Sequence, residues 1–177
     1  MTFFDRMYEP APYLYGVYLA GSLRNPAIPQ LHKTLAEGLN TEVFSDWYSA
    51  GPEADDYWKE YYSGRGMTYA EALKQPASIN TFEFDRKHMH QSRTMVLALP
   101  AGKSGHLELG WFLGSGRPGF ILLDEPDRWD VMYQFATGVT ADVDELIGMI
   151  RPHLNMAEGT GTLLDAALGR INADGSF

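Results

Sequence analysis

Three short stretches of the sequence are apolar on consecutive residues rather than on alternate ones: residues 13–20 (YLYGVYLA), 94–99 (TMVLAL) and 118–123 (PGFILL). A strand whose two faces are both apolar must be covered on both sides, which is typical of parallel sheets. Segments with apolar residues at helical spacing separate these stretches along the chain. This alternation predicts an α/β fold in which helices cover both faces of a doubly wound parallel sheet.

The remaining elements follow from periodicity and from residues that start or end helices. Apolar side chains recur at helical spacing over residues 28–39, and Gly38 and Asn40 mark the end of that helix. Asp142 and Glu145 have the spacing of a capping pair. In chain order we expect a helix over 28–39, a short strand over 41–46, helices over 69–73 and 78–91 separated at Pro76, a helix that begins near 104–106, and a last helix over 140–154.

A chain of 177 residues, 45% of them hydrophobic, is long enough for one sizeable core, and we expect a single domain over residues 1–177. Residues 47–66 are rich in aromatic and acidic side chains, and this insert is expected to cross the mouth of a pocket. Residues 155–177 are rich in glycine and small residues, which is typical of a flexible tail or of an arm that contacts another subunit.

The charge and the absence of cysteine exclude several classes of function. A formal net charge of −9 opposes binding to a nucleic-acid polymer or to an anionic membrane, because the phosphates would be repelled. Without cysteine the chain has no disulfide, no thiolate nucleophile and no cysteine zinc site. No apolar run reaches the roughly 18–20 residues that span a bilayer. We therefore expect a soluble, cytoplasmic protein without a membrane partner.

The segment after residues 94–99 carries the most distinctive polar residues. If a helix begins near Ser104, then Ser104 and Glu108 lie one turn apart on the same face, toward the end with free backbone N–H groups. Apolar residues flank Glu108, which predicts a helix that is buried on nearly every side. A buried carboxylate is costly unless it is paired or functional. Glu108 is therefore a candidate catalytic residue; the alternative is a structural carboxylate that caps a loop or pairs with an arginine.

The segment after the first strand, Gly21-Ser22-Leu23-Arg24-Asn25, has the composition of an anion-binding loop. Backbone N–H groups and a guanidinium can hold a phosphate together, although the same residue types also serve turn formation alone. The later Gly102-Lys103-Ser104 is not a Walker loop, because the earlier glycine of that motif is missing.

A third polar segment, residues 82–90, precedes the 94–99 strand and contains Asp85. His88 and His90 are two positions apart on the expected helix, so they point in different directions and are not expected to bind one metal together. The sequence has no HExxH motif and no GxGxxG motif after the first strand. We therefore expect no catalytic metal, no dinucleotide and no other cofactor.

Together these segments resemble the nucleoside 2-deoxyribosyltransferase family and its relatives, the (deoxy)nucleoside 5'-monophosphate N-glycosidases. The resemblance runs from about residue 15 to residue 123. It rests on residues 18–24 (YLAGSLR), on the helix that contains Asp85, and on residues 102–110 (GKSGHLELG), which end in Glu-Leu-Gly. The resemblance implies a Rossmann-like or flavodoxin-like sheet and a homo-oligomer such as a homodimer.

By this resemblance Glu108 attacks the anomeric carbon of the sugar or stabilises positive charge there. Asp85 matches the acid that assists departure of the base, and Tyr18 matches the tyrosine that positions Glu108. A carboxylate nucleophile divides one difficult displacement into two easier steps. Protonation of the base matters because an ionised purine or pyrimidine is a poor leaving group.

Two departures from the family pattern bear on the substrate. Transferases of the family usually carry an aspartate about six residues before the nucleophile, where this chain has Gly102. The monophosphate glycosidases tend to carry a serine there, and this chain has Ser104 two residues later. The loop with Gly21, Ser22 and Arg24 is more similar to the phosphate grip of the glycosidases, which favours a nucleoside 5'-monophosphate as substrate.

The family often places its base pocket after the second strand, where this chain has Asp46 and Trp47. An aromatic face can stack on a base and a carboxylate can bind its edge; the alternative is that the aromatic residues pack the core or a subunit interface. His106 either contacts the ligand or simply occupies the start of its helix. The predicted binding residues are Gly21, Ser22, Arg24, Asp46, Trp47, Gly102, Ser104 and His106.

The sequence therefore predicts an enzyme that releases the free base from a (deoxy)nucleoside 5'-monophosphate, with water as the acceptor. A deoxyribosyltransferase shares the covalent intermediate and differs in how well its site excludes water. A non-catalytic nucleotide-binding module is the alternative from another class. The presence of Tyr18, Asp85 and Glu108 together argues against that module, because binding an anionic ligand does not require a buried carboxylate.

Overall fold

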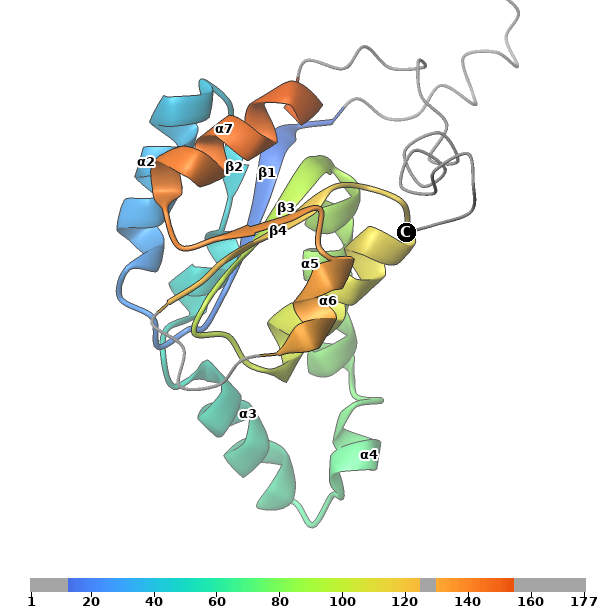
Figure 1. Cartoon of the computed structure of the whole chain (residues 1–177). Coiled ribbons are helices and arrows are strands. Elements are labelled where there is room, and N and C mark those ends of the chain that lie inside the picture. The colour runs from blue at the N-terminus through green and yellow to red at the C-terminus, as the bar shows by residue number, and fades with distance from the viewer. Residues whose placement is uncertain (1–12, 125–129, 155–177) are drawn as a thin grey trace, which may run out of the picture.

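The structure, a computed structural model, describes residues 13–124 and 130–154, and Figure 1 shows their arrangement. Five strands, all parallel, form one sheet in the order β2-β1-β3-β4-β5. This is the doubly wound, flavodoxin-like layout, so the predicted fold class is confirmed. The predicted single domain over 1–177 extends past the described residues, and the tail or arm over 155–177 lies outside them.

Helices and strands alternate along most of the chain. No helix within the two described ranges is long and apolar enough to cross a bilayer. The strands are β1 (Tyr15–Ala20), β2 (Val43–Phe44), β3 (Ser92–Ala98), β4 (Gly119–Leu122) and β5 (Gly138–Thr140). The α-helices are α2 (Ile28–Leu39), α3 (Ala54–Ser63), α4 (Tyr69–Ala72), α5 (Pro76–His90), α6 (Lys103–Gly114) and α7 (Val143–Leu154), and η1 (Asp46–Ala50) and η2 (Val131–Phe135) are 3-10 helices.

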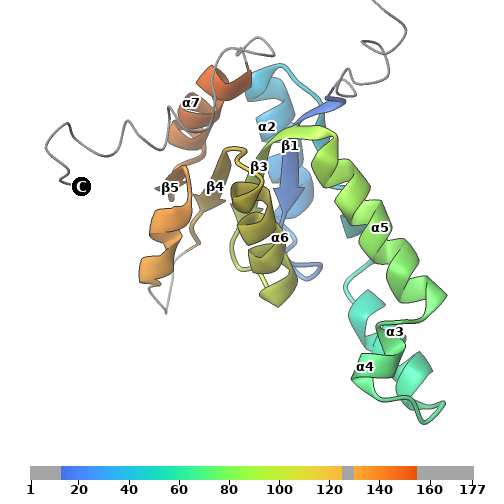
Figure 2. The ribbon, with the colours of Figure 1, turned by 90° about the vertical axis from the view of Figure 1, so that its right-hand side faces the viewer.

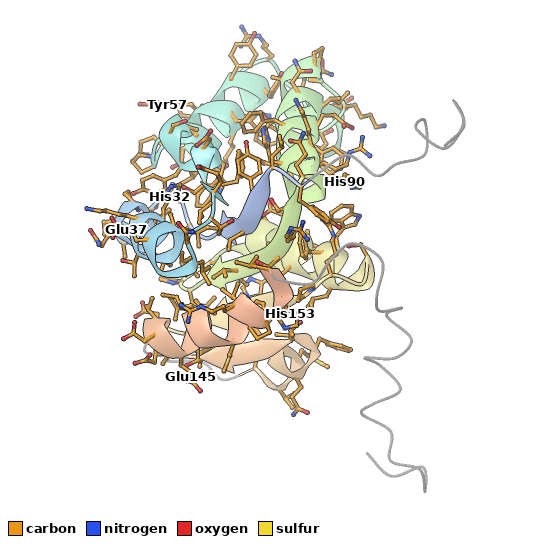
Figure 3. All side chains as sticks on the ribbon, turned by 90° about the horizontal axis from the view of Figure 1, so that it is seen from above. His32, Glu37, Tyr57, His90, Glu145 and His153 are labelled. Atoms are coloured by element: carbon orange, nitrogen blue, oxygen red, sulfur yellow. The ribbon has the colours of Figure 1, made fainter. Side chains whose placement is uncertain are left out.

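Alternate side chains of each central strand enter two separate cores. In β1, Val17 and Leu19 pack under α2 and α7, whereas Tyr18 and Ala20 pack on the side of α5 and α6. Figure 2 views the molecule from the side that α5 and α6 cover. In Figure 3, His90 of α5 and Glu145 of α7 lie on opposite sides of the sheet. The consecutive apolar residues of the strands therefore reflect burial on both faces.

Most element boundaries agree with the sequence, and the differences have local causes. The helix over 28–39 is confirmed as α2. Pro76 does not break a helix but begins α5, because a proline suits the first helical turn, whose N–H groups have no partner within the helix. Strand β5 was not expected, since a three-residue strand is too short to show a pattern, and it takes Thr140 out of the predicted 140–154 helix.

The capping pair of the last helix forms only in part. Asp142 accepts a hydrogen bond from the backbone N–H of Glu145 at 2.8 Å, as a capping residue does. The carboxylate of Glu145 does not return to the backbone of Asp142. It accepts a hydrogen bond from the hydroxyl group of Thr140 instead, which ties the start of α7 to the end of β5.

The prediction that the helix containing Glu108 is buried on nearly every side is wrong. Gly105, Leu109 and Phe112 of α6 are buried against the sheet, but Leu107 is 74% exposed and Trp111 is 39% exposed. Apolar residues lie on all sides of α6, but only one side of the helix packs against β3 and β4. Glu108 lies at the boundary and is partly buried.

The insert after β2 is helical and forms an arm, defined here as residues 54–82. The arm comprises α3, α4 and the start of α5, and it projects beyond the carboxyl edge of the sheet (Figures 1 and 2). Trp58 is at its centre: its indole N–H donates to the Ser78 hydroxyl at 2.8 Å, and its ring packs edge-on against Tyr62 and Tyr69. The arm therefore has a small core of its own.

Candidate active site

The loops after β1 and β3 are neighbours at the carboxyl edge of the sheet. From β1 the chain turns to α2 on one face, and from β3 it turns to α6 on the other, so a topological switch point lies between these strands. Open α/β sheets bind ligands at such a point. The side-chain amide of Asn25 donates to the carbonyl group of Leu99 at 3.5 Å and joins the two loops.

Tyr18, Asp85 and Glu108 come together from three separate elements, β1, α5 and α6. Tyr18 is 1% exposed, while Asp85 and Glu108 are partly buried. Burial raises the pKa of Tyr18 above its ordinary value, and the nearby charges of Glu108 and Asp85 raise it further. The phenol therefore stays neutral at physiological pH and keeps a proton that it can donate to a carboxylate.

Both carboxyl groups hold protons more tightly than ordinary ones. Burial raises the pKa of Glu108 to about 7, and the charge of Asp85 adds to this effect. Burial raises the pKa of Asp85 to about 6, against an opposing effect of His88. Carboxyl groups that titrate near neutral pH are suited to proton transfer and nucleophilic attack.

Within the described part of the chain neither carboxyl group forms an ion pair, although the charge of His88 acts on Asp85. The ion pairs found there involve other acidic residues. The Oδ1 atom of Asp85 is buried and has no hydrogen-bond partner among the described residues. The structural alternative for Glu108, a pair with an arginine, therefore finds no support in those residues.

A stack of aromatic rings holds α5 against the sheet beside these carboxyl groups. Phe44 of β2 stacks on Tyr18 with 5.3 Å between ring centroids and on His88 with 4.1 Å, the latter at an interplanar angle of 7°. The Nδ1–H group of His88 donates to the Phe84 carbonyl oxygen at 2.7 Å. Asp85 lies between Phe84 and His88 in the sequence, so this stack fixes its position.

The sequence did not indicate that Phe44 and His88 support the site. The spacing of Phe84 and His88, four residues apart on a helix, is a signal that they share a face. Their partner Phe44 comes from a strand of only two residues. The contact depends on how α5 crosses β1 and β2, which no local pattern encodes.

The loop after β1 contains a packing glycine and a paired arginine. A Cβ atom at Gly21 would lie 2.7 Å from Cδ1 of Ile28 and 3.3 Å from the Ala98 carbonyl oxygen, so α2 and β3 leave no room for a side chain there. The hydroxyl group of Ser22 accepts a hydrogen bond from the backbone N–H of Arg24 at 3.2 Å. The Arg24 guanidinium forms a 2.6 Å ion pair with Asp56 of α3.

The loop after β3 starts α6 and is open to solvent. Gly102 is the N-cap residue of α6, with no atom within 4 Å of the place a Cβ would occupy, and Ser104 is exposed in the first turn. An open depression of about 630 Å³ lies here. Neither Asp85 nor Glu108 lines it. Its lining residues are Ala101, Gly102, Lys103, His106 and Leu107.

His106 connects the start of α6 to η2. Its Nδ1–H group donates to the Gly102 carbonyl oxygen at 2.8 Å, which leaves Nε2 to accept from the Tyr133 hydroxyl at 2.9 Å. The two rings also stack with 5.8 Å between centroids. The sequence analysis missed Tyr133, because η2 was not predicted.

Asp46 and Trp47 begin η1, directly after β2. The indole N–H of Trp47 donates to the Leu19 carbonyl oxygen at 2.7 Å, and its ring packs against the cores on both faces of the sheet. The polar end of Trp47 is therefore used within the fold. Asp46 is exposed at the edge of the sheet where the loops after β1 and β3 lie.

Among residues 13–124 and 130–154, no three histidine, aspartate or glutamate side chains are grouped so that they could hold a metal ion. No family model and no curated protein sequence matches the chain. Its function must therefore be argued from the site itself.

Proposed function

We propose that the protein cleaves the N-glycosidic bond of a (deoxy)nucleoside 5'-monophosphate, as an enzyme of the nucleoside 2-deoxyribosyltransferase type. One observation carries the proposal: Asp85 and Glu108 lie close together with raised pKa values, next to the neutral Tyr18 phenol and without an ion pair in the described residues. Two such carboxyl groups are what a glycosidic bond requires, one as nucleophile and one as acid.

In the first step the ionised Glu108 attacks the anomeric carbon of the sugar. The bond between that carbon and the base nitrogen breaks, and its electron pair leaves with the base. The carboxylic acid of Asp85 gives its proton to the departing base. The products of this step are a neutral free base, an ester between Glu108 and the sugar, and an ionised Asp85.

In the second step water hydrolyses this ester. Asp85, now a carboxylate, accepts a proton from the water as the water oxygen attacks the anomeric carbon. The bond from that carbon to the Glu108 oxygen breaks, and Glu108 returns to its ionised form. We assign Tyr18, whose phenol lies near Glu108, the role of donating a hydrogen bond that orients the attacking oxygen.

The loops at the switch point provide groups for the rest of the substrate. Arg24 and the free backbone N–H groups at the start of α6 are suited to an anionic phosphate. Asp46 and the exposed part of Trp47 are suited to the edge and the face of a base. Gly21 does not contact the ligand in this proposal, but its lack of a side chain lets β1, α2 and β3 approach closely. The hydroxyl group of Ser22 holds the turn that positions Arg24.

The exposed apolar side chains of the arm support a homo-oligomer as the working form. Tyr57, Tyr69 and Phe82 are 68%, 71% and 59% exposed, and clusters of such residues commonly mark protein interfaces. The molar mass in solution, measured by light scattering during size-exclusion chromatography, tests this part of the proposal. A mass of 19.8 kDa at all concentrations would contradict it.

A base-release experiment tests the proposed reaction. The purified protein is mixed with a panel of nucleosides and 5'-monophosphates, and free base is followed by chromatography. We expect release from monophosphates and little from nucleosides. Base exchange only in the presence of a second base would favour the transferase, and saturable binding without turnover would favour a nucleotide-binding module.

Matched variants assign the chemistry to its residues. Glu108→Gln keeps the shape of the side chain but cannot attack, so turnover should be lost. Asp85→Asn removes the acid and should lower the rate by about 10²- to 10⁴-fold. Glu42→Gln is the control for loss of one negative charge, because Glu42 is exposed at the opposite edge of the sheet, before β2. Wild-type turnover in Glu108→Gln would refute the mechanism.

A further inference from the structure

The guanidinium group of Arg24 has an anionic partner within the chain. Its Nη2 atom lies 2.6 Å from Oδ2 of Asp56, in the first turn of α3. The side chains of Arg24 and Asp56 are 55% and 53% exposed. The pair joins the loop after β1 to the arm, two segments that are 32 residues apart in the sequence.

This ion pair is a weak contact that a phosphate can replace. Exposed ion pairs contribute about 0–1 kcal/mol, because water solvates both charges well. A phosphate carries more charge than a carboxylate and can engage a guanidinium and backbone N–H groups together. An anionic ligand at the switch point therefore competes favourably with Asp56 for Arg24.

We propose that Asp56 tunes the affinity of the site for phosphate ligands: it occupies Arg24 until the phosphate group of a ligand displaces it. This inference rests on the proposed function for the identity of the ligand, a nucleoside 5'-monophosphate. The cost of displacing Asp56 is the same for every anion that binds through Arg24, so Asp56 weakens the binding of all of them by the same factor. Ligands without a phosphate leave the ion pair intact.

Displacement of Asp56 also removes a contact between α3 of the arm and the loop after β1. Among the described residues, the Arg24–Asp56 pair is the one polar side-chain contact between α3 and the loop after β1. The other such contact of α3 to a distant helix, from Trp58 to Ser78, stays within the arm. Phosphate binding is therefore expected to loosen the first turn of α3, while the contacts of Trp58 within the arm remain.

Binding measurements on the full chain test the proposal. Inorganic phosphate and a nucleoside 5'-monophosphate are titrated by calorimetry into the wild type and into Asp56→Asn. Removing the competitor should tighten the binding of both by about two- to fivefold, the change that corresponds to an exposed ion pair. Binding of the matching nucleoside should not change. Equal or weaker phosphate binding by Asp56→Asn would overturn the proposal, as would the absence of phosphate binding in both proteins.

Asp55→Asn is the matched control. Asp55 is the exposed neighbour of Asp56 in the same turn of α3 and makes no ion pair with Arg24. Asp55→Asn removes the same charge as Asp56→Asn. If both variants bind phosphate more tightly by the same factor, the effect comes from the change in net charge and the Arg24–Asp56 pair has no role. In an Arg24→Gln background, Asp56→Asn should have no further effect, because the coupling requires both residues.

Hydrogen exchange of the α3 backbone amides is a second measurement, and a change in net charge alone should not alter it. Phosphate should speed the exchange of the α3 amides in the wild type, and Asp56→Asn should show fast exchange without phosphate. The outcomes separate the two proposals. If no base is released but phosphate binding responds to Asp56→Asn, the proposed function fails and this inference stands. If base is released but Asp56→Asn behaves as Asp55→Asn does, only this inference fails.

Discussion

The charge of Asp85 on α5 raises the pKa of Glu108 on α6, although the two residues belong to different helices. Burial alone would already disfavour ionisation of both carboxyl groups. Their proximity adds repulsion whenever both are charged. The two groups therefore titrate as a coupled pair, which holds one proton near neutral pH.

The shared proton predicts a bell-shaped dependence of turnover on pH. The reactive form needs an ionised Glu108 and a protonated Asp85. It is the minor of the two singly protonated forms, because Asp85 has the lower pKa, but its population also peaks between the two pKa values. Below about pH 6 both groups are protonated and Glu108 cannot attack; above about pH 7 both are ionised and the base leaves without a proton. The rate at saturating substrate should be highest between these values. A rate that is flat from pH 5 to pH 9 would contradict the assignment.

Asp85→Asn should change the shape of this profile. Without the acid, the fall in rate at alkaline pH disappears. The rise at acidic pH should remain, because it then reports the ionisation of Glu108 alone, without the neighbouring charge that raises its pKa. Turnover of the variant, followed by release of free base, should therefore increase to a plateau at a much lower maximum. A retained alkaline fall would mean that another group supplies the proton.

Folding stability should depend on pH through Glu108, independently of any substrate. Its pKa is raised from 4.5 to about 7 in the folded protein, so the folded state binds the proton more tightly than the unfolded state. The contribution is complete below about pH 4.5 and is lost as pH rises through about 7. Glu108→Gln cannot ionise, and at pH 8 it should be more stable than the wild type by on the order of 2 kcal/mol.

Urea unfolding at pH 8 and at pH 4.5 measures this effect. The two proteins should differ at pH 8 and nearly coincide at pH 4.5. The same comparison with Glu42→Gln, at an exposed position, should show no such difference. Equal stabilities of wild type and Glu108→Gln at pH 8 would show that Glu108 ionises at no cost, and the argument for an activated carboxyl pair would lose its basis.

The sheet could be predicted because its signals are local. In β1, β3 and β4 the apolar residues are consecutive, and in α2 they recur at helical spacing. Each pattern indicates which residues are buried without reference to the rest of the chain. Strand β5 and helix η2 have only three and five residues, too few for a period to emerge. The exposed face of α6 was missed for a different reason: its composition is apolar, and only the position of the sheet determines which side is covered.

The site was predictable in its parts but not in its contacts. The rule that polar loops follow parallel strands identifies Arg24 and His106 as neighbours of the switch point. Their partners, Asp56 and Tyr133, come from segments whose positions depend on the whole chain. The proximity of Asp85 to Glu108 depends likewise on how α5 crosses the sheet.

Trp47 should prove more important for folding than its exposed part suggests. Trp47→Phe keeps an aromatic face but loses the hydrogen bond from the indole N–H to the Leu19 carbonyl oxygen. The loss should lower the free energy of unfolding by about 1 kcal/mol, measured by urea denaturation. If the ring stacks on the base, the Michaelis constant should change little in this variant and increase in Trp47→Ala. An unchanged stability of Trp47→Phe would show that the bond contributes nothing.

Gly105 and Gly110 offer a matched pair of substitutions within α6. A Cβ atom at Gly105 would lie 2.7 Å from Cδ1 of Leu97 in β3, whereas at Gly110 no atom lies within 4 Å. Alanine is favoured over glycine in a helix by about 1 kcal/mol. Gly110→Ala should therefore stabilise the protein by up to that amount. Gly105→Ala must displace Leu97 or the helix, which costs about 1–3 kcal/mol.

The functional consequence of the two substitutions should differ as well. Gly105 lies one turn before Glu108 on α6, so moving the helix away from β3 also moves the carboxyl group away from Tyr18 and Asp85. Because a misplacement of about 1 Å can reduce turnover by about 10²-fold, Gly105→Ala should lower kcat while Gly110→Ala leaves it near the wild-type value. Thermal unfolding and base release, measured on both variants, test this together. Wild-type kcat in a destabilised Gly105→Ala would mean that the position of Glu108 does not depend on how closely α6 packs against β3.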